Sequence, residues 1–156
     1  MHSLELLEDT LQPGCRALDV GSGSGYLTAC MAHMVGTTGM IVGMDHIPEL
    51  IELSKRNLKE DGHREKLDSG QICMVIGDGR DGWEYEAPYG CIHVGAAVAT
   101  LPHALVQQDD PLGPEAGQQT LDLVEKDREG KVTKTKLMGV KYVPLCEKRY
   151  QLNLKK

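Results

Sequence analysis

Three glycines at alternate positions follow a short apolar segment near the N-terminus of this chain. Residues 17–25 read Ala-Leu-Asp-Val-Gly-Ser-Gly-Ser-Gly, which places Gly21, Gly23 and Gly25 within five residues. Glycine lets the backbone turn sharply, adopt a positive φ and approach a ligand without a Cβ in the way. Because a helix-like segment follows, the pattern predicts a strand, a loop that holds a nucleotide cofactor, and a helix. An ordinary glycine-rich turn is the alternative, since a lone match of this kind is weak.

The spacing of the glycines separates two classes of cofactor. The dinucleotide fingerprint is G-x-G-x-x-G, whose third glycine lets the helix pack closely beneath a pyrophosphate. This chain has G-x-G-x-G, and Tyr26 stands where the fingerprint needs its third glycine. The spacing therefore favours S-adenosylmethionine, which carries no phosphate, and leaves a nicotinamide dinucleotide as the alternative.

Two acidic residues stand at the ends of further apolar segments. Asp45 ends the segment 40–44, and Asp78 lies just after the segment 71–76. An acidic side chain at the tip of the second strand can bind both hydroxyls of a ribose, and Asp78 can accept a hydrogen bond from the exocyclic amine of adenine. The alternatives are that Asp45 caps the helix that begins near Pro48 and that Asp78 belongs to an ordinary turn.

Apolar segments alternate with helical patterns along the first hundred residues, which predicts an α/β fold with a parallel sheet. After Pro48 the apolar spacing is helical, and the polar run 61–70 predicts the end of that helix. In open sheets of this type, ligands bind at the carboxyl ends of the strands. The glycine loop and both acidic residues fall on that edge, together with Gly95. Four segments read as buried strands: residues 17–20, 40–44, 71–76 and 91–95.

The alternation of strand and helix stops beyond Pro102. Residues 121–124 and 132–135 instead predict a two-stranded antiparallel ribbon, and residues 137–145 predict a last strand. A length of 156 residues allows one domain. Within it we expect a cofactor-binding part at about residues 14–100, and a substrate side with the C-terminal ribbon at about residues 101–156.

Composition narrows the classes of function and partner. A net charge of −6 and a pI near 5.5 argue against nucleic acid as the main partner. Five cysteines without a C-x-x-C pair and six scattered histidines lead us to expect no metal site. The sequence shows no signal peptide and no long apolar segment, so we expect a cytosolic monomer without a membrane partner.

Five motifs together resemble the protein-L-isoaspartate (D-aspartate) O-methyltransferase family. The resemblance runs from about His2 to Gln151 and implies a Rossmann-like, S-adenosylmethionine-dependent methyltransferase fold. It implies that the chain transfers a methyl group from S-adenosyl-L-methionine to the carboxylate of L-isoaspartyl and D-aspartyl residues in damaged proteins, which initiates their repair. The motifs that carry it are, in chain order, Leu18–Gly25, Asp45-His46, Gly77–Arg80, Ile92–Ala97 and Leu137–Val140.

The resemblance also assigns the binding of the cofactor. It implies that Asp19 and the glycine loop hold the methionine part, that Asp45 and His46 hold the ribose, and that Asp78 and Gly79 hold the adenine. No catalytic residue is assigned, because a carboxylate is already nucleophilic at neutral pH and alignment of the reacting groups is the main task. The complete implied cofactor-binding set is Asp19, Gly21, Ser22, Gly23, Gly25, Asp45, His46, Asp78, Gly79 and Gln151.

Two departures from the family pattern affect the substrate side. Of the family's N-terminal substrate-binding segment only Met1-His2 stands in this sequence, and Asp109-Asp110 stands where the family has an apolar central strand. We therefore expect that segment and one central strand to be missing. Two alternatives to an active enzyme follow: a member that binds the cofactor or a protein partner without transferring a methyl group, or an unstable isoform without a function.

Overall fold

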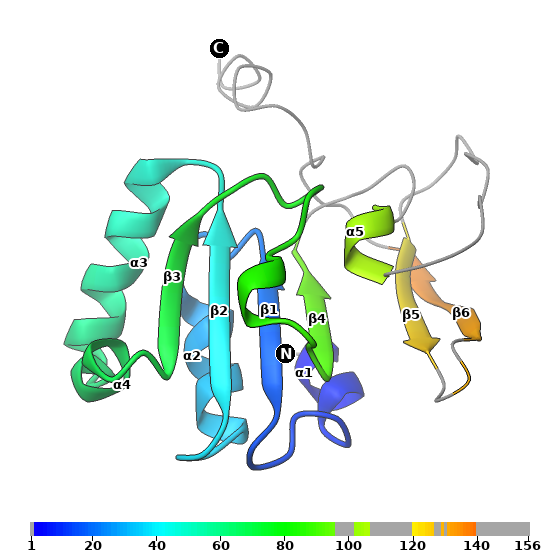
Figure 1. Ribbon diagram of the computed structural model, residues 1–156, viewed down its shortest axis with the longest axis horizontal. Coiled ribbons are helices and arrows are strands. Elements are labelled where there is room, and N and C mark those ends of the chain that lie inside the picture. Colours follow the sequence, from blue (N-terminus) through cyan, green and yellow to red (C-terminus); the bar gives the residue numbers. More distant parts are fainter. Residues whose placement is uncertain (1, 96–101, 107–119, 127–128, 130, 140–156) are drawn as a thin grey trace.

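The computed structural model of this protein describes residues 2–95, 102–106, 120–126, 129 and 131–139. Strands and helices alternate from β1 to β4, as the sequence predicts (Figure 1). In chain order the elements are α1 (His2–Leu7), β1 (Arg16–Val20), α2 (Tyr26–Met34), β2 (Met40–Asp45), α3 (Pro48–Glu60), α4 (Arg64–Asp68), β3 (Ile72–Ile76), the 3-10 helix η1 (Glu84–Glu86), β4 (Cys91–Val94), α5 (His103–Val106), β5 (Thr120–Lys126) and β6 (Val132–Gly139).

Four parallel strands form the main sheet in the order β3-β2-β1-β4, which confirms the predicted α/β fold class. β1 pairs with β2 on one side and with β4 on the other, so that Asp19 lies opposite both Gly43 and His93. The chain moves outward from β1 to β3 and then returns to the other side of β1. The order of the strands therefore reverses beside the carboxyl end of β1, and open α/β sheets bind their ligands at such a reversal.

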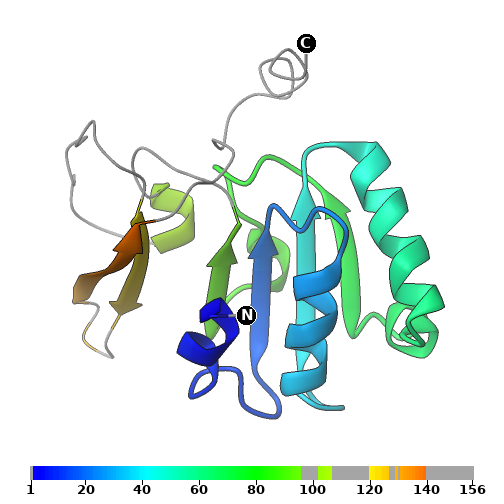
Figure 2. The ribbon, with the colours of Figure 1, turned by 180° about the vertical axis from the view of Figure 1, so that it is seen from behind.

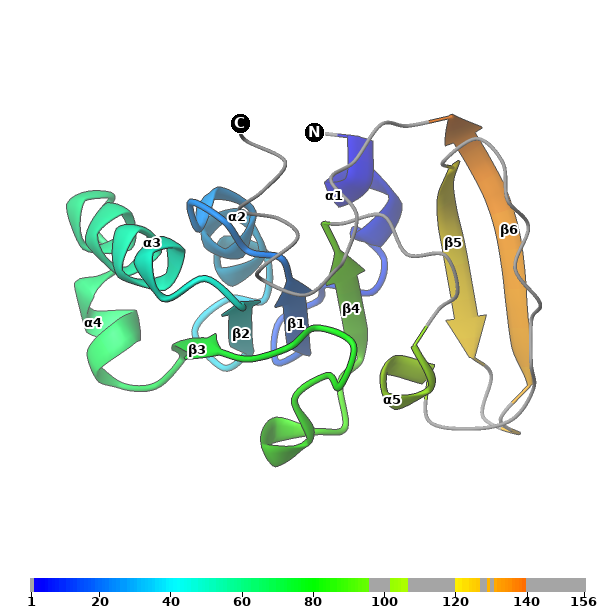
Figure 3. The same ribbon diagram turned by 90° about the horizontal axis from the view of Figure 1, so that it is seen from above.

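Both faces of the sheet are covered. The helices α1, α2 and α3 lie on one face and η1 lies on the other (Figures 2 and 3). Ala17 and Ile41 point to the helical face with Met31 of α2, whereas Leu18 and Val42 point to the opposite face. That second face is completed by the partly buried side chains Trp83, Tyr89 and Leu105. Because successive strand residues point to opposite faces, strands covered on both sides read as continuous apolar runs.

The helix α3 begins where the sequence predicts, with Pro48 in its first turn and Ile51 and Leu58 buried. The polar run 61–70 does end this helix, but it also contains the short helix α4, in which no residue is buried. The sequence does not predict α4, because Leu67 is the one apolar residue of this five-residue helix and leaves no apolar periodicity to recognise.

β5 and β6 pair antiparallel, with Leu123 opposite Thr135, which confirms the predicted ribbon. β6 continues through Gly139, so the prediction of a separate strand that begins at residue 137 is wrong. The reason is that no glycine or proline interrupts the chain between Thr135 and Leu137. Residues 140–145 and the expected loss of a central strand near residues 109–110 lie outside the described residues. None of the described helices is both long and apolar enough to cross a lipid bilayer.

Candidate cofactor site

The glycine loop connects the end of β1 to the start of α2. The amides of Gly21 and Ser22 both donate to the carbonyl oxygen of Met44, each at 2.9 Å, so the loop rests against the end of β2. Gly21, Gly23 and Gly25 have φ values of 80°, 53° and 83°. These angles lie in the left-handed region, which residues other than glycine rarely adopt. The predicted succession of strand, glycine loop and helix is therefore present.

The far end of the loop packs against α3. A Cβ atom added to Gly25 would lie 2.9 Å from the Cβ atom of Ser54, which leaves no room for a side chain. Three residues further along α3, the side-chain amide of Asn57 donates to the carbonyl oxygen of Ser24 at 2.9 Å. Gly25 therefore has a packing role as well as a backbone role in shaping the loop.

Ser22 supplies a polar group that is available to a ligand. Its Oγ atom is buried and has no hydrogen-bond partner in the part of the chain that the structure describes. A buried hydroxyl without a partner costs about 1–3 kcal/mol, so such groups in native proteins call for an explanation. A ligand that brings a polar group to the glycine loop would satisfy this hydroxyl. The loop thus fits the polar methionine end of S-adenosylmethionine, which the sequence analysis assigns to it.

Asp19 is only 1% exposed, and its carboxylate is turned toward α2 and β4. The hydroxyl of Thr28 donates to Oδ2 at 2.6 Å, and Nδ1 of His93 lies 3.0 Å from Oδ1. Both oxygens therefore have protein partners, and Asp19 links the strand before the glycine loop to the helix after it. The family resemblance implies that Asp19 holds the cofactor, but it does not imply the pairing of Asp19 with His93.

A signal for that pairing is present in the sequence. Asp19-Val20-Gly21 and His93-Val94-Gly95 have the same spacing before the glycine that follows each strand. In neighbouring parallel strands with the same glycine exit, residues at the same distance from the exit lie opposite each other, as Asp19 and His93 do. Recognising it requires knowing that β4, and not β3, is the second neighbour of β1.

Asp45 lies at the end of β2 and is 8% exposed. Its Oδ2 accepts from the amide of Gly23 at 3.2 Å, and its Oδ1 accepts from the amide of Ile47 at 3.0 Å. The residue at the N-cap of α3 is Ile47 and not Asp45, so the capping alternative is wrong in its position. Each carboxylate oxygen can accept more than one hydrogen bond, which leaves capacity for the hydroxyls of a ribose.

Asp78 and His46 lie close together at the neighbouring strand ends. The amide and the Nε atom of Arg80 both donate to Asp78 Oδ1 at 2.9 Å. Hydrogen bonds from the Arg80 side chain lower the pKa of Asp78 against the opposing effect of burial, and nearby His46 lowers it further. The turn that the sequence analysis kept as an alternative is also present, since the amide of Asp81 donates to the Asp78 carbonyl at 3.0 Å.

The structure thus gathers the glycine loop and the two acidic residues at one edge of the sheet. The amide of Gly77 donates to the Asp45 carbonyl at 3.1 Å and joins the ends of β2 and β3, with Gly79 buried beside Asp78. Gly95 closes the other side, because its amide donates to the carbonyl of Val20 at 2.8 Å. Gln151 lies outside the described residues. No group of three His, Cys, Asp or Glu side chains within the described ranges is arranged to hold a metal ion.

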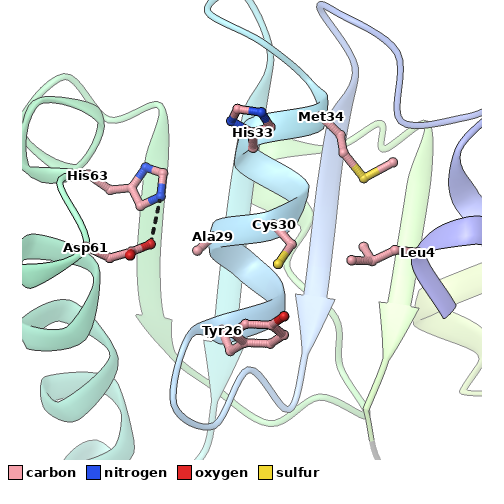
Figure 4. A pocket seen from close by; sticks show the side chains of 8 residues that line it. All are labelled: Leu4, Tyr26, Ala29, Cys30, His33, Met34, Asp61 and His63. Carbon is pink, nitrogen blue, oxygen red and sulfur yellow. Dashed lines mark ion pairs between the residues drawn. The ribbon is translucent and has the colours of Figure 1, made fainter. Parts of the chain in front are cut away.

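A groove of about 380 Å³ lies elsewhere, along the outer side of α2 (Figure 4). Tyr26 stands at its end near the glycine loop, and His33 stands at the other end of the helix. On the α3 side, Nε2 of His63 lies 3.4 Å from Oδ2 of Asp61. The groove follows the helix and not the strand ends, so it is distinct from the site described above. Its lining residues are Leu4, Tyr26, Ala29, Cys30, His33, Met34, Asp61 and His63.

Comparison with known proteins agrees with this arrangement. Residues 1–150 match the model of the protein-L-isoaspartate(D-aspartate) O-methyltransferase family. The chain is 46% identical to protein-L-isoaspartate O-methyltransferase 1 of Arabidopsis thaliana, over 97% of this chain and 69% of the relative. It is 43% identical to the Caenorhabditis elegans enzyme of the same name, over 98% of this chain and 71% of the relative. It covers about half, 52%, of the A. thaliana relative numbered 2, at 45% identity.

A solved structure of similar shape is that of a protein-L-isoaspartate O-methyltransferase from Plasmodium falciparum in complex with S-adenosyl-L-homocysteine. The TM-score is 0.79 at 31% identity, and the match covers 93% of this chain and 72% of that one. The family match extends over nearly the whole chain, and the relatives share well over a third of its residues. This chain therefore belongs to the protein-L-isoaspartate(D-aspartate) O-methyltransferase family.

Proposed function

We propose that this chain binds S-adenosyl-L-methionine and transfers its methyl group to the carboxylate of L-isoaspartyl and D-aspartyl residues in damaged proteins. The observation that carries the proposal is the buried hydroxyl of Ser22, which has no hydrogen-bond partner among the described residues, in a glycine loop that donates a hydrogen bond to Asp45. Membership of the family supports it, and the P. falciparum relative holds the demethylated form of the same cofactor.

The chemistry asks little of the protein in the way of proton transfer. S-adenosyl-L-methionine supplies an electrophilic methyl group on a sulfonium, and the products are a methyl ester and S-adenosyl-L-homocysteine. An exposed aspartyl-type carboxyl has a pKa near 4, so the substrate is already ionised at neutral pH. Proximity and orientation can lower a barrier by about 7–11 kcal/mol, which makes alignment the main contribution of the protein. The backbone amide nitrogen of the following residue then attacks the ester carbonyl and releases methanol, which closes a succinimide whose hydrolysis returns some normal aspartate.

The residues at the sheet edge divide the work of binding. The glycine loop and the Ser22 hydroxyl bind the methionine part, and Asp45 binds the ribose hydroxyls at the end of β2. Asp78 accepts a hydrogen bond from the adenine amine, and an ionised carboxylate is the stronger acceptor. The Arg80 side chain lowers the pKa of Asp78 and so favours the ionised form.

Two measurements test the proposal. Radiolabelled S-adenosyl-L-methionine is supplied with paired peptides that differ only in one isoaspartyl or aspartyl residue, and we expect label on the isoaspartyl peptide alone. Thermal unfolding is followed with and without S-adenosyl-L-homocysteine. At 100 times its dissociation constant this product stabilises a binding-competent fold by about 2.7 kcal/mol, which raises the midpoint by several degrees.

The two measurements separate the alternatives. A raised midpoint without label on either peptide would favour a member that binds the cofactor but does not transfer methyl. A broad transition that S-adenosyl-L-homocysteine does not move would favour an unstable isoform. Label on both peptides alike would contradict the isoaspartyl specificity that we propose.

We also propose that the chain acts as a monomer in the cytosol, with isoaspartyl proteins as substrates and without a nucleic-acid or membrane partner. The net charge of −6 supports the exclusion of nucleic acid, because phosphate contacts need a basic surface. An odd number of cysteines without a C-x-x-C pair supports a reducing compartment. Light scattering coupled to size exclusion should give a mass near 17.1 kDa.

A further inference from the structure

A buried network of side chains joins three elements around Asp19. The carboxylate of Asp19 is 1% exposed, Thr28 is fully buried, and the side chain of His93 is 11% exposed. Thr28 Oγ1 donates to one carboxylate oxygen at 2.6 Å, and His93 Nδ1 stands 3.0 Å from the other. The network therefore connects β1 to α2 and to β4 at a place that water hardly reaches.

The register of the sheet makes this network possible. His93 lies directly opposite Asp19 in the parallel pair β1–β4, and Gly43 lies opposite Asp19 in the pair β1–β2. A Cβ atom added to Gly43 would stand 2.6 Å from Cε of Met74 and 3.0 Å from Thr28 Oγ1, closer than ordinary contact allows. The glycine thus leaves space for the Met74 side chain and for Thr28 where Thr28 reaches the carboxylate.

The network holds both ends of the glycine loop. Asp19 lies two residues before Gly21, and Thr28 lies three residues after Gly25. A single carboxylate therefore connects the backbone that enters the loop to the backbone that leaves it. Fixing both ends removes conformational freedom from the loop before any ligand binds, and an ordered site loses less entropy on binding.

We propose that His93 is a positioning residue for the cofactor site. Together with Thr28 it fixes the carboxylate of Asp19, and through Asp19 it keeps the glycine loop in the shape that receives the cofactor. The consequence for affinity rests on the proposed function, whereas the ordering of the loop is a property of the chain alone. The test therefore has one readout with a ligand and one without.

The test compares the parent chain with His93→Leu, His93→Asn and Ile72→Val. Leucine removes the donor, whereas the amide of asparagine can stand near the position of Nδ1. Ile72→Val makes a small loss of packing in β3, away from the network, and is the matched control for stability. Calorimetry measures the binding of S-adenosyl-L-homocysteine, and amide hydrogen exchange without ligand measures the order of Gly23 and Gly25 relative to the β3 amides.

We expect His93→Leu to weaken binding about tenfold or more, because a hydrogen bond to a charged group is lost. We also expect the loop amides to exchange about tenfold faster, while the β3 amides keep their parent rates. His93→Asn should restore both values to within about threefold of the parent. Ile72→Val should leave the affinity and the loop amides unchanged.

Each contrary outcome is distinguishable. Parent affinity together with parent exchange in His93→Leu overturns the proposal and leaves the proposed function intact. A parent chain that does not bind S-adenosyl-L-homocysteine contradicts the proposed function, and the loop amides then decide the role of His93. Faster exchange in the loop and in β3 alike would mean a merely structural role, which also overturns the proposal. If His93→Leu does not fold, Thr28→Val is measured against Thr28→Ser with the same expectations.

Discussion

Asp45 serves the loop as well as the proposed ligand. Its two carboxylate oxygens accept the amides of Gly23 and Ile47, which ties the middle of the glycine loop to the entrance of α3. Asp45 both holds the glycine loop in place and faces the proposed ligand, so its substitution affects stability and binding together. The two effects must be measured separately.

We expect Asp45→Ala to weaken the binding of S-adenosyl-L-homocysteine at least about tenfold, since hydrogen bonds to a charged group contribute about 1.5–3 kcal/mol each. The free energy of unfolding should fall by about 2 kcal/mol, because two backbone amides lose their acceptor. Calorimetry and urea unfolding give the two values. Asp45→Asn retains one oxygen acceptor and should fall between the parent and the alanine variant. Unchanged affinity in Asp45→Ala would remove Asp45 from the ribose site.

Because of Cys91 in β4, the free energy of unfolding should fall as the pH rises above 9. Burial raises the pKa of its thiol from 9.0 to about 12, and the neighbouring Cys15 and Asp19 add to the shift. A raised pKa means that the folded state holds the proton more tightly. The stabilisation is therefore complete below pH 9 and is lost as the pH rises toward 12.

We expect the free energy of unfolding of the parent to fall more steeply with pH than that of Cys91→Ala. From pH 8 to pH 10, the free energy of unfolding of the parent should fall by about 1.4 kcal/mol more than that of Cys91→Ala. The reason is that above pH 9 the folded state holds about one more proton than the unfolded state, over a span of one pH unit. Urea unfolding at pH 8, 9 and 10 measures it. Tyr89, whose pKa burial also raises to about 12, is present in both chains and cancels in the comparison. Equal slopes would mean that the Cys91 thiol is not held protonated by the fold.

The positions of the site residues were predictable from the sequence, but their partners were not. The parallel direction of the strands alone places the glycine loop, Asp45 and Asp78 at one edge of the sheet, independently of side-chain conformation. The contact between Asp19 and His93 depends on which strand joins β1, and the one between Arg80 and Asp78 depends on side-chain direction. Neither is contained in apolar periodicity. Gln151 remains a prediction.

At the scale of elements, the loop and α3 form one packed unit. Gly25 touches Ser54 so closely that a methyl group would not fit, and Asn57 holds the carbonyl of Ser24. Gly62, just after α3, has almost the same φ as Gly25, +84° against +83°, but has open space around it. This pair of glycines separates the cost of backbone conformation from the cost of contact.

Gly62→Ala should lower the free energy of unfolding by about 1–2 kcal/mol, the cost of a left-handed alanine. Gly25→Ala should carry that cost and in addition about 1–3 kcal/mol from overpacking against Ser54. It should also weaken the binding of S-adenosyl-L-homocysteine, because the loop must move away from α3. Urea unfolding and calorimetry on the two variants make the comparison. Equal destabilisation would mean that the contact with Ser54 relaxes without cost.

The elements that the sequence predicted are those with a strong physical signal. β1 and β2 are buried on both faces, all four strands read as apolar runs, and α3 combines Pro48 at its start with buried residues at helical spacing. The helices α1 and α4 have six and five residues, too few for a periodicity to be recognised. The extent of β6 was misjudged because the sequence marks the turn at residues 127–130 and gives no signal for where the ribbon ends.

At the scale of the whole molecule, one sheet is shared by two cores. The helical face and the face covered by Trp83 and Tyr89 are built on the same four strands, so unfolding of the strands removes both cores together. Trp83 is the sole tryptophan of the chain and reports on the second face. Far-ultraviolet circular dichroism reports mainly on the helices of the first face.

We therefore expect tryptophan fluorescence and circular dichroism to give the same midpoint in urea unfolding. Coincident transitions from independent probes are the mark of a cooperative domain. Tyr89→Phe removes the hydrogen bond from the Tyr89 hydroxyl to the Trp83 carbonyl. It should lower the free energy of unfolding by about 0.5–1.5 kcal/mol and shift both midpoints to lower urea concentration together. A fluorescence midpoint well below that of circular dichroism would show that the second face opens by itself.

The place of β4 beside β1 has a consequence for the order in which the molecule is made. Asp19 and His93 are separated by 74 positions in the chain. Ribosomes add about 5–20 residues per second, so roughly 4–15 s pass between the synthesis of these two residues. During that interval the nascent chain carries its glycine loop, β2 and α3 without the histidine that completes the network. The network is therefore completed only after the glycine loop, β2 and α3 have already been made.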